Sequence, residues 1–344
     1  MSVAYVQDAV VMMFNFEESR LKGEIKKQGA KRVLIQLPEG LKPDGLRLAV
    51  VVEEAGALAI VSSDPCHGAC DLALHDAESL GVDLVVHYGH SGIIPQGQIP
   101  TIYIEARAKI KVNTAIRKAL PLLNQWKTVG LVTTVQHIQT LNETKDLLHD
   151  RGKKVIIGKA SGRAKYDGQV IGCDYSSARS ISEEVDGFLF IGGGKLHALG
   201  TALATTKPVI VADPFDEKAY SINIEVQKIL KQRWANIFEA RKAKKFGVLI
   251  GLKSGQKRIK EAIEIKEKLQ KNDKMVTLLA LREVTPEALM QFPNIDAFIN
   301  TTCPCVALYD TSFFLKPVLT LNETLVLLGA MSWNELFKNG LIIR

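Results

Sequence analysis

The five cysteines of this chain are its most chemically versatile residues, and they fall in three places. Cys66 and Cys70 lie in the first third of the sequence, Cys173 in the second, and Cys303 and Cys305 in the last. Thiolates are reactive nucleophiles and soft ligands that select zinc, copper(I) or iron–sulfur clusters. What the chain can do chemically therefore depends on whether these three places meet.

The composition indicates a globular protein of a reducing compartment, which we expect to be the cytoplasm. Of the 344 residues, 47% are apolar and 24% are charged, and the net charge of +7 is dispersed along the chain. A dispersed excess favours a solvated surface over a nucleic-acid groove. Residues 1–14 lack the features of a signal peptide, and we expect no membrane span. An odd number of cysteines without an export signal favours metal-binding or reactive thiols over disulfides.

Short continuous apolar runs alternate with helical segments, a pattern typical of parallel sheets flanked by helices. The runs occur in three groups of four with the same order and nearly equal spacing, which indicates internal triplication. We expect strands at 32–37, 57–61, 82–89 and 101–104, at 126–134, 155–158, 186–191 and 208–211, and at 246–251, 275–279, 296–300 and 317–320. These groups predict three similar parallel-sheet α/β domains, covering residues 1–111, 112–218 and 219–344.

One cysteine of each predicted domain follows a predicted strand. Cys70 and Cys173 come after the second strands of domains one and two, and Cys303 comes after the third strand of domain three. Right-handed crossovers place all such loops at the carboxyl edge of their sheets. If the three domains pack with these edges inward, one thiolate from each converges at a central site. Three thiolates without a fourth are suited to a [4Fe–4S] cluster with one iron open to substrate. Three unrelated buried cysteines are the alternative.

Two cysteines are left over by this scheme. Cys66 precedes Cys70 with the spacing that opens the C-x₃-C-x₂-C motif of common radical enzymes, but residue 73 is alanine. Cys305 lies two residues from Cys303, too close for both to bind one corner of a cluster. We interpret Cys66 and Cys305 as non-ligands. His67 and His75 are alternative ligands, although a single histidine is more often a surface or core residue.

Glycines form a second candidate site. Gly192, Gly193 and Gly194 follow the third strand of domain two and precede a helix, so a ligand can approach their backbone N–H groups. The spacing is neither that of a Walker loop nor that of a dinucleotide fingerprint, and a tight strand–helix turn is the alternative. The loops after the first strand of each domain should face the same cavity, and they contain Pro38, Glu39, Gln136, His137, Lys253, Ser254 and Gln256. Lys253 could pair with a ligand carboxylate.

Short motifs over nearly the whole chain, from about residue 16 to residue 333, carry a resemblance to a known family. They are Gly68–Asp71, Ile171–Cys173, Gly192–Gly194 with His197–Gly200, Asp213–Phe215, Thr302–Pro304 and Pro317–Thr320. This set resembles the archaeal diphthamide synthase family. The resemblance implies three α/β domains around a [4Fe–4S] cluster, usually in a homodimer. It also implies a transferase that uses S-adenosylmethionine as cosubstrate, needs an electron donor, and modifies a histidine of translation elongation factor 2.

In that family the reduced cluster donates an electron and the bond from sulfur to the methionyl γ-carbon breaks. The 3-amino-3-carboxypropyl radical adds to the histidine ring, and methylthioadenosine leaves. By position, the resemblance implies that Cys70, Cys173 and Cys303 bind the cluster and act in catalysis through it. It implies that S-adenosylmethionine is held by Gly192–Gly194 and residues 253–256, with His197, Gly200 and Asp213 from the same motifs. The chain departs from the family at Cys305, commonly arginine, and at His67, commonly tyrosine.

Two other interpretations remain open at this point. Quinolinate synthase shares the triplicated architecture and three-cysteine cluster, but it uses the open iron as a Lewis acid in a dehydration. A non-catalytic α/β ligand-binding module with incidental cysteines belongs to a different class. Iron content and the fate of S-adenosylmethionine separate the three.

Overall fold

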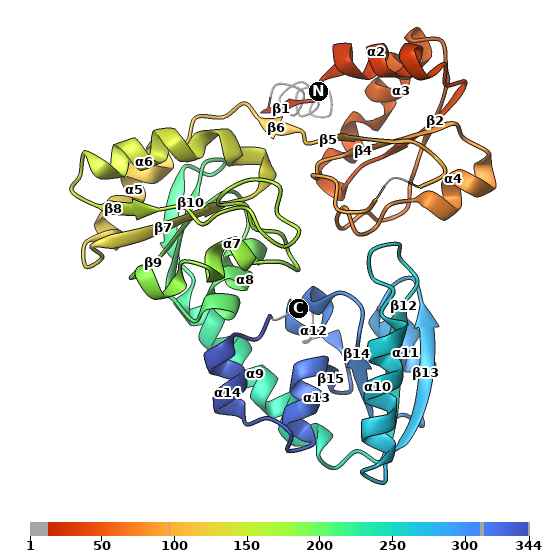
Figure 1. Ribbon diagram of the computed structural model, residues 1–344, viewed down its shortest axis with the longest axis vertical. Helices are drawn as coiled ribbons and strands as arrows, with labels where there is room; N and C mark the ends of the chain where they lie inside the picture. Colours follow the sequence, from red (N-terminus) through yellow and green to blue (C-terminus); the bar gives the residue numbers. More distant parts are fainter. Residues whose placement is uncertain (1–12, 96, 310–312, 343–344) are drawn as a thin grey trace, which may run out of the picture. The chain divides into compact units, whose positions relative to one another are not determined.

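The computed structural model describes residues 13–95, 97–309 and 313–342, and in these ranges the chain forms two compact units (Figure 1). Unit 1 contains the chain up to Lys111 together with residues 135–139 and 253–255. Unit 2 contains the remainder. Of residues 1–14, which were assessed above for the features of a signal peptide, only Met13 and Phe14 lie within the described residues. No helix in the described ranges is both long enough and apolar enough to cross a membrane.

Unit 1 is built on a four-stranded parallel sheet in the order β3-β2-β4-β5. Successive residues of a strand point to opposite faces. Val33 and Ile35 accordingly pack with helices α2 and α3, whereas Leu34 and Val85 pack on the other face with Ala77 of α4. The elements are β1 (Phe14–Asn15), α2 (Glu18–Gln28), β2 (Arg32–Gln36), η1 (Glu39–Asp44), α3 (Gly45–Glu54), β3 (Leu58–Val61), α4 (Leu74–Leu80), β4 (Leu84–Tyr88), β5 (Thr101–Ile104) and β6 (Arg107–Ala108).

The second sheet, in unit 2, has the order β8-β7-β9-β10-β11, and its first four strands are parallel. β9 and β10 are buried along their whole length, as expected for central strands covered by helices on both faces. The elements are α5 (Asn113–Ala119), η2 (Leu120–Leu123), β7 (Thr128–Thr133), η3 (Val135–Thr140), α6 (Leu141–His149), β8 (Lys154–Ile156), α7 (Ser176–Arg179), η4 (Ser182–Glu184), β9 (Gly187–Ile191), α8 (Leu196–Thr205), β10 (Val209–Asp213) and β11 (Lys218–Ser221).

The third sheet, also in unit 2, is parallel with the order β13-β12-β14-β15. Beside it the Arg233 guanidinium of α9 forms a fully buried ion pair with Glu323 of α13 at 2.5 Å, and it also donates to the Val318 carbonyl at 2.7 Å. The elements are α9 (Asn223–Ala240), β12 (Lys245–Gly251), α10 (Ile259–Gln270), β13 (Met275–Leu281), α11 (Pro286–Met290), β14 (Ala297–Asn300), α12 (Pro304–Tyr309), β15 (Val318–Thr320), α13 (Leu321–Leu327) and α14 (Trp333–Asn339).

The predicted class, α/β with parallel sheets, is confirmed, and every predicted strand is present. In each sheet the first strand along the chain lies between the second and the third, and the fourth lies outside the third. The short strands β1, β6 and β11 were not predicted. β11 pairs antiparallel with β10, with Lys218 opposite Asp213, so the second sheet extends beyond the boundary predicted at residue 218. The carboxyl-edge loops of these sheets hold the candidate site residues.

Candidate functional site

The Cys70 loop follows β3 and is fixed within unit 1 by residues 253–255. The Cys70 carbonyl accepts a hydrogen bond from the Gly255 N–H at 2.8 Å. The Ser254 hydroxyl donates to the Leu72 carbonyl at 3.0 Å. A Cβ on Gly255 would lie 2.6 Å from the Cys70 Cβ and 2.7 Å from its Cα, so only glycine permits this approach. The contact fixes the backbone at the residue that was predicted to bind metal.

A buried ion pair lies beside Cys70. The Lys253 ammonium contacts the Asp71 carboxylate at 2.6 Å, and both side chains are at most 13% exposed. At this burial the pair is screened by water far less than a surface pair. Our expectation that Lys253 binds a ligand carboxylate stays a prediction. The structure adds that such a ligand would share the ammonium with Asp71.

The loop after β7 also belongs to unit 1. The Gln136 side-chain amide donates to the Gly89 carbonyl at 2.6 Å and to the Glu105 carbonyl at 3.2 Å, and His137 is buried. In the loop after β2, the Glu39 carboxylate accepts from the Cys66 N–H at 3.3 Å and contacts Lys42 at 2.7 Å. Its hydrogen bond with the Lys42 ammonium lowers the pKa of Glu39. The structure thus gives Gln136 and Glu39 positions that hold unit 1 together.

Pro38 precedes η1 and packs against Gly89, where a Cβ would lie 2.8 Å from the proline ring. Gly89 has a φ of +81°, which also requires glycine. Pro38 therefore fixes the turn at the end of β4.

Cys173 lies after β8 in a tight loop where Ile171 and Asp174 exchange backbone hydrogen bonds. The Asp174 carboxylate accepts from the Arg163 N–H at 2.6 Å and from the Ser176 N–H at 2.9 Å. This places the Arg163 guanidinium 3.6 Å from the Cys173 sulfur. Hydrogen bonds to the sulfurs are among the factors that set the reduction potential of an iron–sulfur cluster. Sequence reasoning missed this contact of Arg163, because an irregular loop of nine residues separates it from Cys173.

Cys303 lies between β14 and α12. The Asn300 side chain fixes this turn by donating to the Cys303 carbonyl at 2.7 Å and accepting from the Thr302 N–H at 3.0 Å. Two residues later, the Cys305 thiol donates to the Gly172 carbonyl at 3.0 Å. Within unit 2, the Cys303–Cys305 segment therefore contacts the Cys173 loop. None of the five cysteines, all of which the structure describes, forms a disulfide.

The Gly192–Gly194 loop joins β9 to α8, and two of its glycines have positive φ angles. Gly193 and Gly194 are exposed. The Asp213 carboxylate at the end of β10 accepts from the Phe215 N–H at 2.9 Å and is buried. A Cβ on Gly193 would lie 2.8 Å from the Phe215 ring, so the two loops are neighbours. An exposed glycine loop before a ten-residue helix keeps backbone N–H groups accessible to a ligand.

Three other predicted cofactor residues have packing contacts. A Cβ on Gly200 would lie 1.8 Å from the Tyr175 hydroxyl, so this glycine makes room for a buried tyrosine. His197 stacks on Phe190 with a centroid distance of 6.2 Å, and burial lowers its pKa to about 4. Gln256 is buried and lies close to Gly251.

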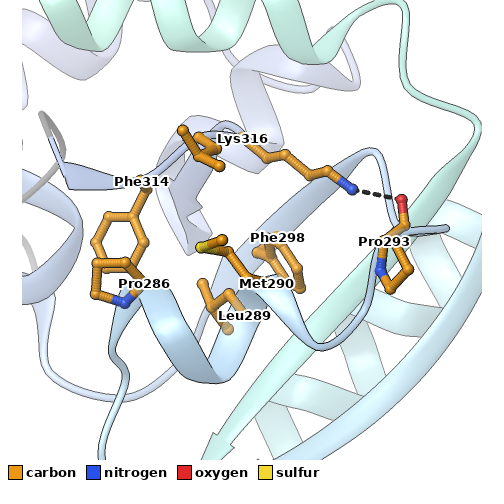
Figure 2. A pocket seen from close by; sticks show the side chains of 8 residues that line it. Pro286, Leu289, Met290, Pro293, Phe298, Phe314 and Lys316 are labelled. Carbon is orange, nitrogen blue, oxygen red and sulfur yellow. Dashed lines mark hydrogen bonds between the residues drawn. The ribbon is translucent and has the colours of Figure 1, made fainter.

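The described residues also contain an apolar cavity of about 220 Å³ in unit 2, beside α11 and β14 (Figure 2). Its lining includes Leu289, Met290, Phe298 and Phe314, and the Lys316 ammonium donates to the Pro293 carbonyl at 2.7 Å. The lining contains none of the cysteines, glycines or charged residues that the sequence identified. We therefore do not assign this cavity to the predicted site.

The comparison with protein families decides which interpretation applies. A family model for diphthamide synthesis proteins matches residues 37–338, which is most of the chain. The chain belongs to this diphthamide synthesis family. The matched range contains Cys70, Cys173 and Cys303 and the Gly192–Gly194 loop.

Individual members of the diphthamide synthesis family are similar over more than nine tenths of this chain. The chain is 38% identical to a 2-(3-amino-3-carboxypropyl)histidine synthase of Pyrococcus horikoshii, over 92% of both chains. It is 30% identical to subunit 1 of the Schizosaccharomyces pombe synthase, over 94% of this chain and 76% of that one. The crystal structure of Dph2 from Pyrococcus horikoshii with a 4Fe-4S cluster superposes with a TM-score of 0.86 at 37% identity, covering 93% of each chain. These similarities exclude the quinolinate synthase and ligand-module alternatives.

Proposed function

We propose that this protein transfers the 3-amino-3-carboxypropyl group of S-adenosylmethionine to a histidine of translation elongation factor 2, the first step of diphthamide biosynthesis. One observation carries the proposal. The chain matches a diphthamide family structure that contains a 4Fe-4S cluster, and it has three cysteines on three loops that follow strands of parallel sheets. The relatives named as synthases of 2-(3-amino-3-carboxypropyl)histidine give the reaction and class it as a transferase.

The donor set fits a [4Fe–4S] cluster. Cys70, Cys173 and Cys303 would supply three soft sulfur ligands and leave one iron open. When bound and reduced, the cluster supplies the single electron that cleaves the bond from sulfur to the methionyl γ-carbon of S-adenosylmethionine. Cys70 is positioned by its backbone bond to Gly255, and Arg163 donates toward the Cys173 sulfur.

The cosubstrate needs donors for an anionic carboxylate and room for a nucleoside. Lys253, held beside Cys70 by Asp71, offers the charge for the carboxylate in a site shielded from water. Gly193 and Gly194 offer exposed backbone to the ligand, whereas the Gly192 N–H donates to the Ala212 carbonyl at 3.1 Å. These groups would orient the cosubstrate, and its orientation would select which carbon–sulfur bond breaks, because positioning decides between similar bonds. Gln136, His137, Pro38 and Glu39 lie on loops that we expect to bind the cosubstrate as well, and the contacts of Gln136, Pro38 and Glu39 hold these loops in place.

The organisation of the protein follows from the same proposal. The three sheets, which share the same strand order, derive from internal triplication of one α/β domain. The three domains cover residues 1–111, 112–218 and 219–344, and each brings one cysteine to a central site. The active form is a cytoplasmic homodimer that receives electrons from a separate donor. The net charge of +7 steers acidic partners toward it.

The test uses anaerobically purified protein, dithionite, S-adenosylmethionine and an archaeal elongation factor 2. We expect methylthioadenosine as the nucleoside product and a mass gain of one aminocarboxypropyl group on one histidine. The anaerobic protein should contain about four irons per chain. Recovery of 5′-deoxyadenosine as the main product would overturn the proposed bond cleavage. An unmodified elongation factor, with the cluster intact and reduced, would overturn the substrate.

A further inference from the structure

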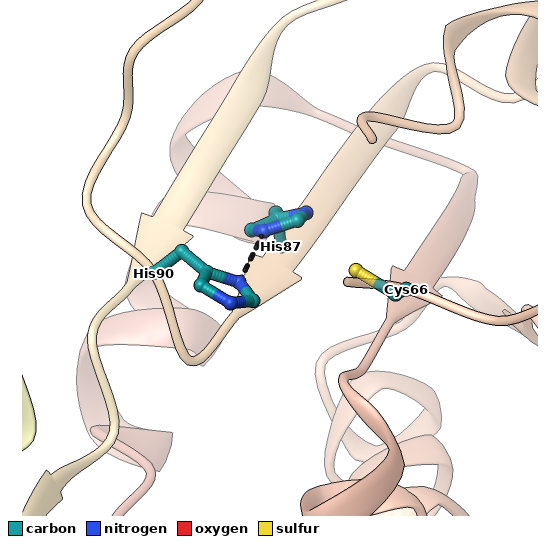
Figure 3. A group of neighbouring side chains, drawn as sticks. All are labelled: Cys66, His87 and His90. Atoms are coloured by element: carbon teal, nitrogen blue, oxygen red, sulfur yellow. Dashed lines mark hydrogen bonds between the residues drawn. The ribbon is translucent and has the colours of Figure 1, made fainter. Parts of the chain in front are cut away.

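Unit 1 contains a second group of metal-binding side chains, separate from Cys70. Cys66 lies on the loop after β3, His87 lies in β4, and His90 follows two residues after that strand ends. One ligand atom from each lies within 4.8 Å of the other two, and Cys66 and His87 are buried. Figure 3 shows the Cys66 sulfur directed toward His87 and His90.

A glutamine fixes which nitrogen of His87 faces this group. The Gln36 side-chain nitrogen donates to the Asp71 carbonyl at 2.6 Å, and its oxygen accepts from the Ala73 N–H at 3.2 Å. The same oxygen lies 2.8 Å from His87 Nδ1, so Nδ1 must carry the proton and donate. The Nε2 atom of His87 then presents a lone pair. Metal-binding histidines are usually oriented in this way, by a hydrogen bond from the ring nitrogen that does not bind the metal.

The His90 ring lies next to the His87 ring in this group. Its Nδ1 lies 3.0 Å from His87 Nε2, and the ring centroids are 5.2 Å apart. Two ring nitrogens at this distance either share a proton or bind one metal ion. Burial, with His90 as a further cause, lowers the pKa of His87 well below its ordinary value. His87 is therefore neutral at physiological pH, which is the form that binds metals.

We propose that Cys66, His87 and His90 bind a zinc ion in unit 1. This site is distinct from the cluster cysteines and goes beyond the proposed function. Zinc favours tetrahedral sulfur and imidazole ligands, with Zn–S near 2.3 Å and Zn–N near 2.0–2.1 Å, so its ligand atoms are roughly 3.3–3.7 Å apart. The present spacing reaches that geometry with side-chain movements on the order of 1 Å. A water molecule would take the fourth position.

Proton balance is part of the proposal. Zinc binds the Cys66 thiolate, so the thiol proton is released to solvent, and the proton of His90 moves from Nδ1 to Nε2. A cysteine thiol is mostly protonated at neutral pH, so about one proton leaves for each zinc ion that binds. Zinc affinity should consequently rise with pH.

The site would stabilise the loop that carries a cluster ligand. Gln36 contacts both His87 and the Asp71 carbonyl, and Asp71 directly follows Cys70. Cys66 begins the same loop, and its N–H donates to Glu39. A zinc ion would therefore join both ends of the Cys66–Asp71 loop to β4. The expected role is structural, in positioning Cys70, rather than catalytic.

The test measures zinc and iron together in the intact protein. We expect about one zinc per chain beside the iron, after passage over a weak chelating resin. Zinc-edge X-ray absorption should show one sulfur neighbour near 2.3 Å, lost in Cys66→Ser. His90→Gln should lower zinc content at least tenfold while most of the iron remains. Cys305→Ser and His75→Gln, which change a thiol and an exposed imidazole elsewhere, should leave the zinc unchanged.

A Cys70→Ala variant separates this site from zinc that replaces iron at the cluster cysteines. It should lose iron and keep zinc with the same sulfur neighbour. Zinc that disappears with Cys70→Ala but survives Cys66→Ser would overturn the proposal. Zinc below one tenth of an equivalent in protein from zinc-supplemented cells, or copper in its place, would overturn it as well. His90 is only partly buried, so His90→Gln gives a decisive result even if Cys66→Ser fails to fold.

Discussion

Replacing Gly255 tests whether residues 253–255 position Cys70. In Gly255→Ala the new Cβ would lie 2.6 Å from the Cys70 Cβ, 2.7 Å from its Cα and 3.0 Å from its oxygen. Non-bonded carbons prefer about 3.5–4.0 Å, so one of the two backbone segments must retreat by roughly 1 Å. The hydrogen bond from residue 255 to the Cys70 carbonyl, now 2.8 Å, would then lengthen beyond a useful distance.

The free-energy cost of Gly255→Ala follows from the overpacking and from the lost hydrogen bond. Overpacking costs about 1–3 kcal/mol, and a lost backbone hydrogen bond costs about 1 kcal/mol. We therefore expect the contact of residue 255 with Cys70 to be weaker by about 2–4 kcal/mol. Since 1.4 kcal/mol is tenfold in an equilibrium constant, local opening should become about 30- to 700-fold more frequent.

Hydrogen exchange measured by mass spectrometry reports this opening directly. The peptide covering residues 66–74 should exchange at least about 30-fold faster in Gly255→Ala, and the protein should hold less iron. Gly23→Ala is the matched control, because Gly23 lies in α2 with no atom within 4 Å of an added Cβ. Unchanged exchange in residues 66–74, with normal iron, would refute the argument that Gly255 holds Cys70 in place.

Three further predictions concern other contacts. Cys303→Ala should lose most of the iron, whereas Cys305→Ser should keep it, as measured by the iron content per chain. The reverse result would make Cys305 the cluster ligand and Cys303 the non-ligand. Glu323→Gln leaves the buried Arg233 guanidinium without its carboxylate, which should cost about 3–5 kcal/mol and lower the melting temperature by about 4–7 °C. Gly200→Ala forces a buried tyrosine hydroxyl aside, so it should destabilise the protein by about 1–3 kcal/mol with cluster content retained; a normal melting temperature would contradict this packing role.

Local signals explain why the fold was predictable. Each predicted strand is a short apolar run that can be recognised from the sequence, and in β2 and β9 a proline or a glycine follows within two residues. β11 was missed because Lys218–Ser221 is a four-residue, partly exposed edge strand with no apolar run. The membership of residues 135–139 and 253–255 in unit 1 could not be predicted either. It depends on contacts between segments distant in sequence, such as Lys253 with Asp71.

The candidate site was predicted in part for the same reason. Cysteines after strands are visible in a sequence, so Cys70, Cys173 and Cys303 could be identified as candidates. His87 was assigned to an apolar strand, and its relation to Cys66 depends on the pairing of β2 with both β3 and β4. The available signal was a pair of histidines three residues apart at the end of a predicted strand. That spacing has a meaning only once the neighbouring loop is known.

The two cysteines that the sequence left over have different partners in the structure. The Cys305 sulfur donates to the Gly172 carbonyl at 3.0 Å, and a carbonyl only accepts, so Cys305 carries its proton there. A cluster ligand is a thiolate and has no proton to donate. The hydrogen bond therefore favours Cys303 as the ligand, with Cys305 connecting its segment to the Cys173 loop. Cys66 faces two imidazoles instead, and zinc is the partner that uses all three side chains.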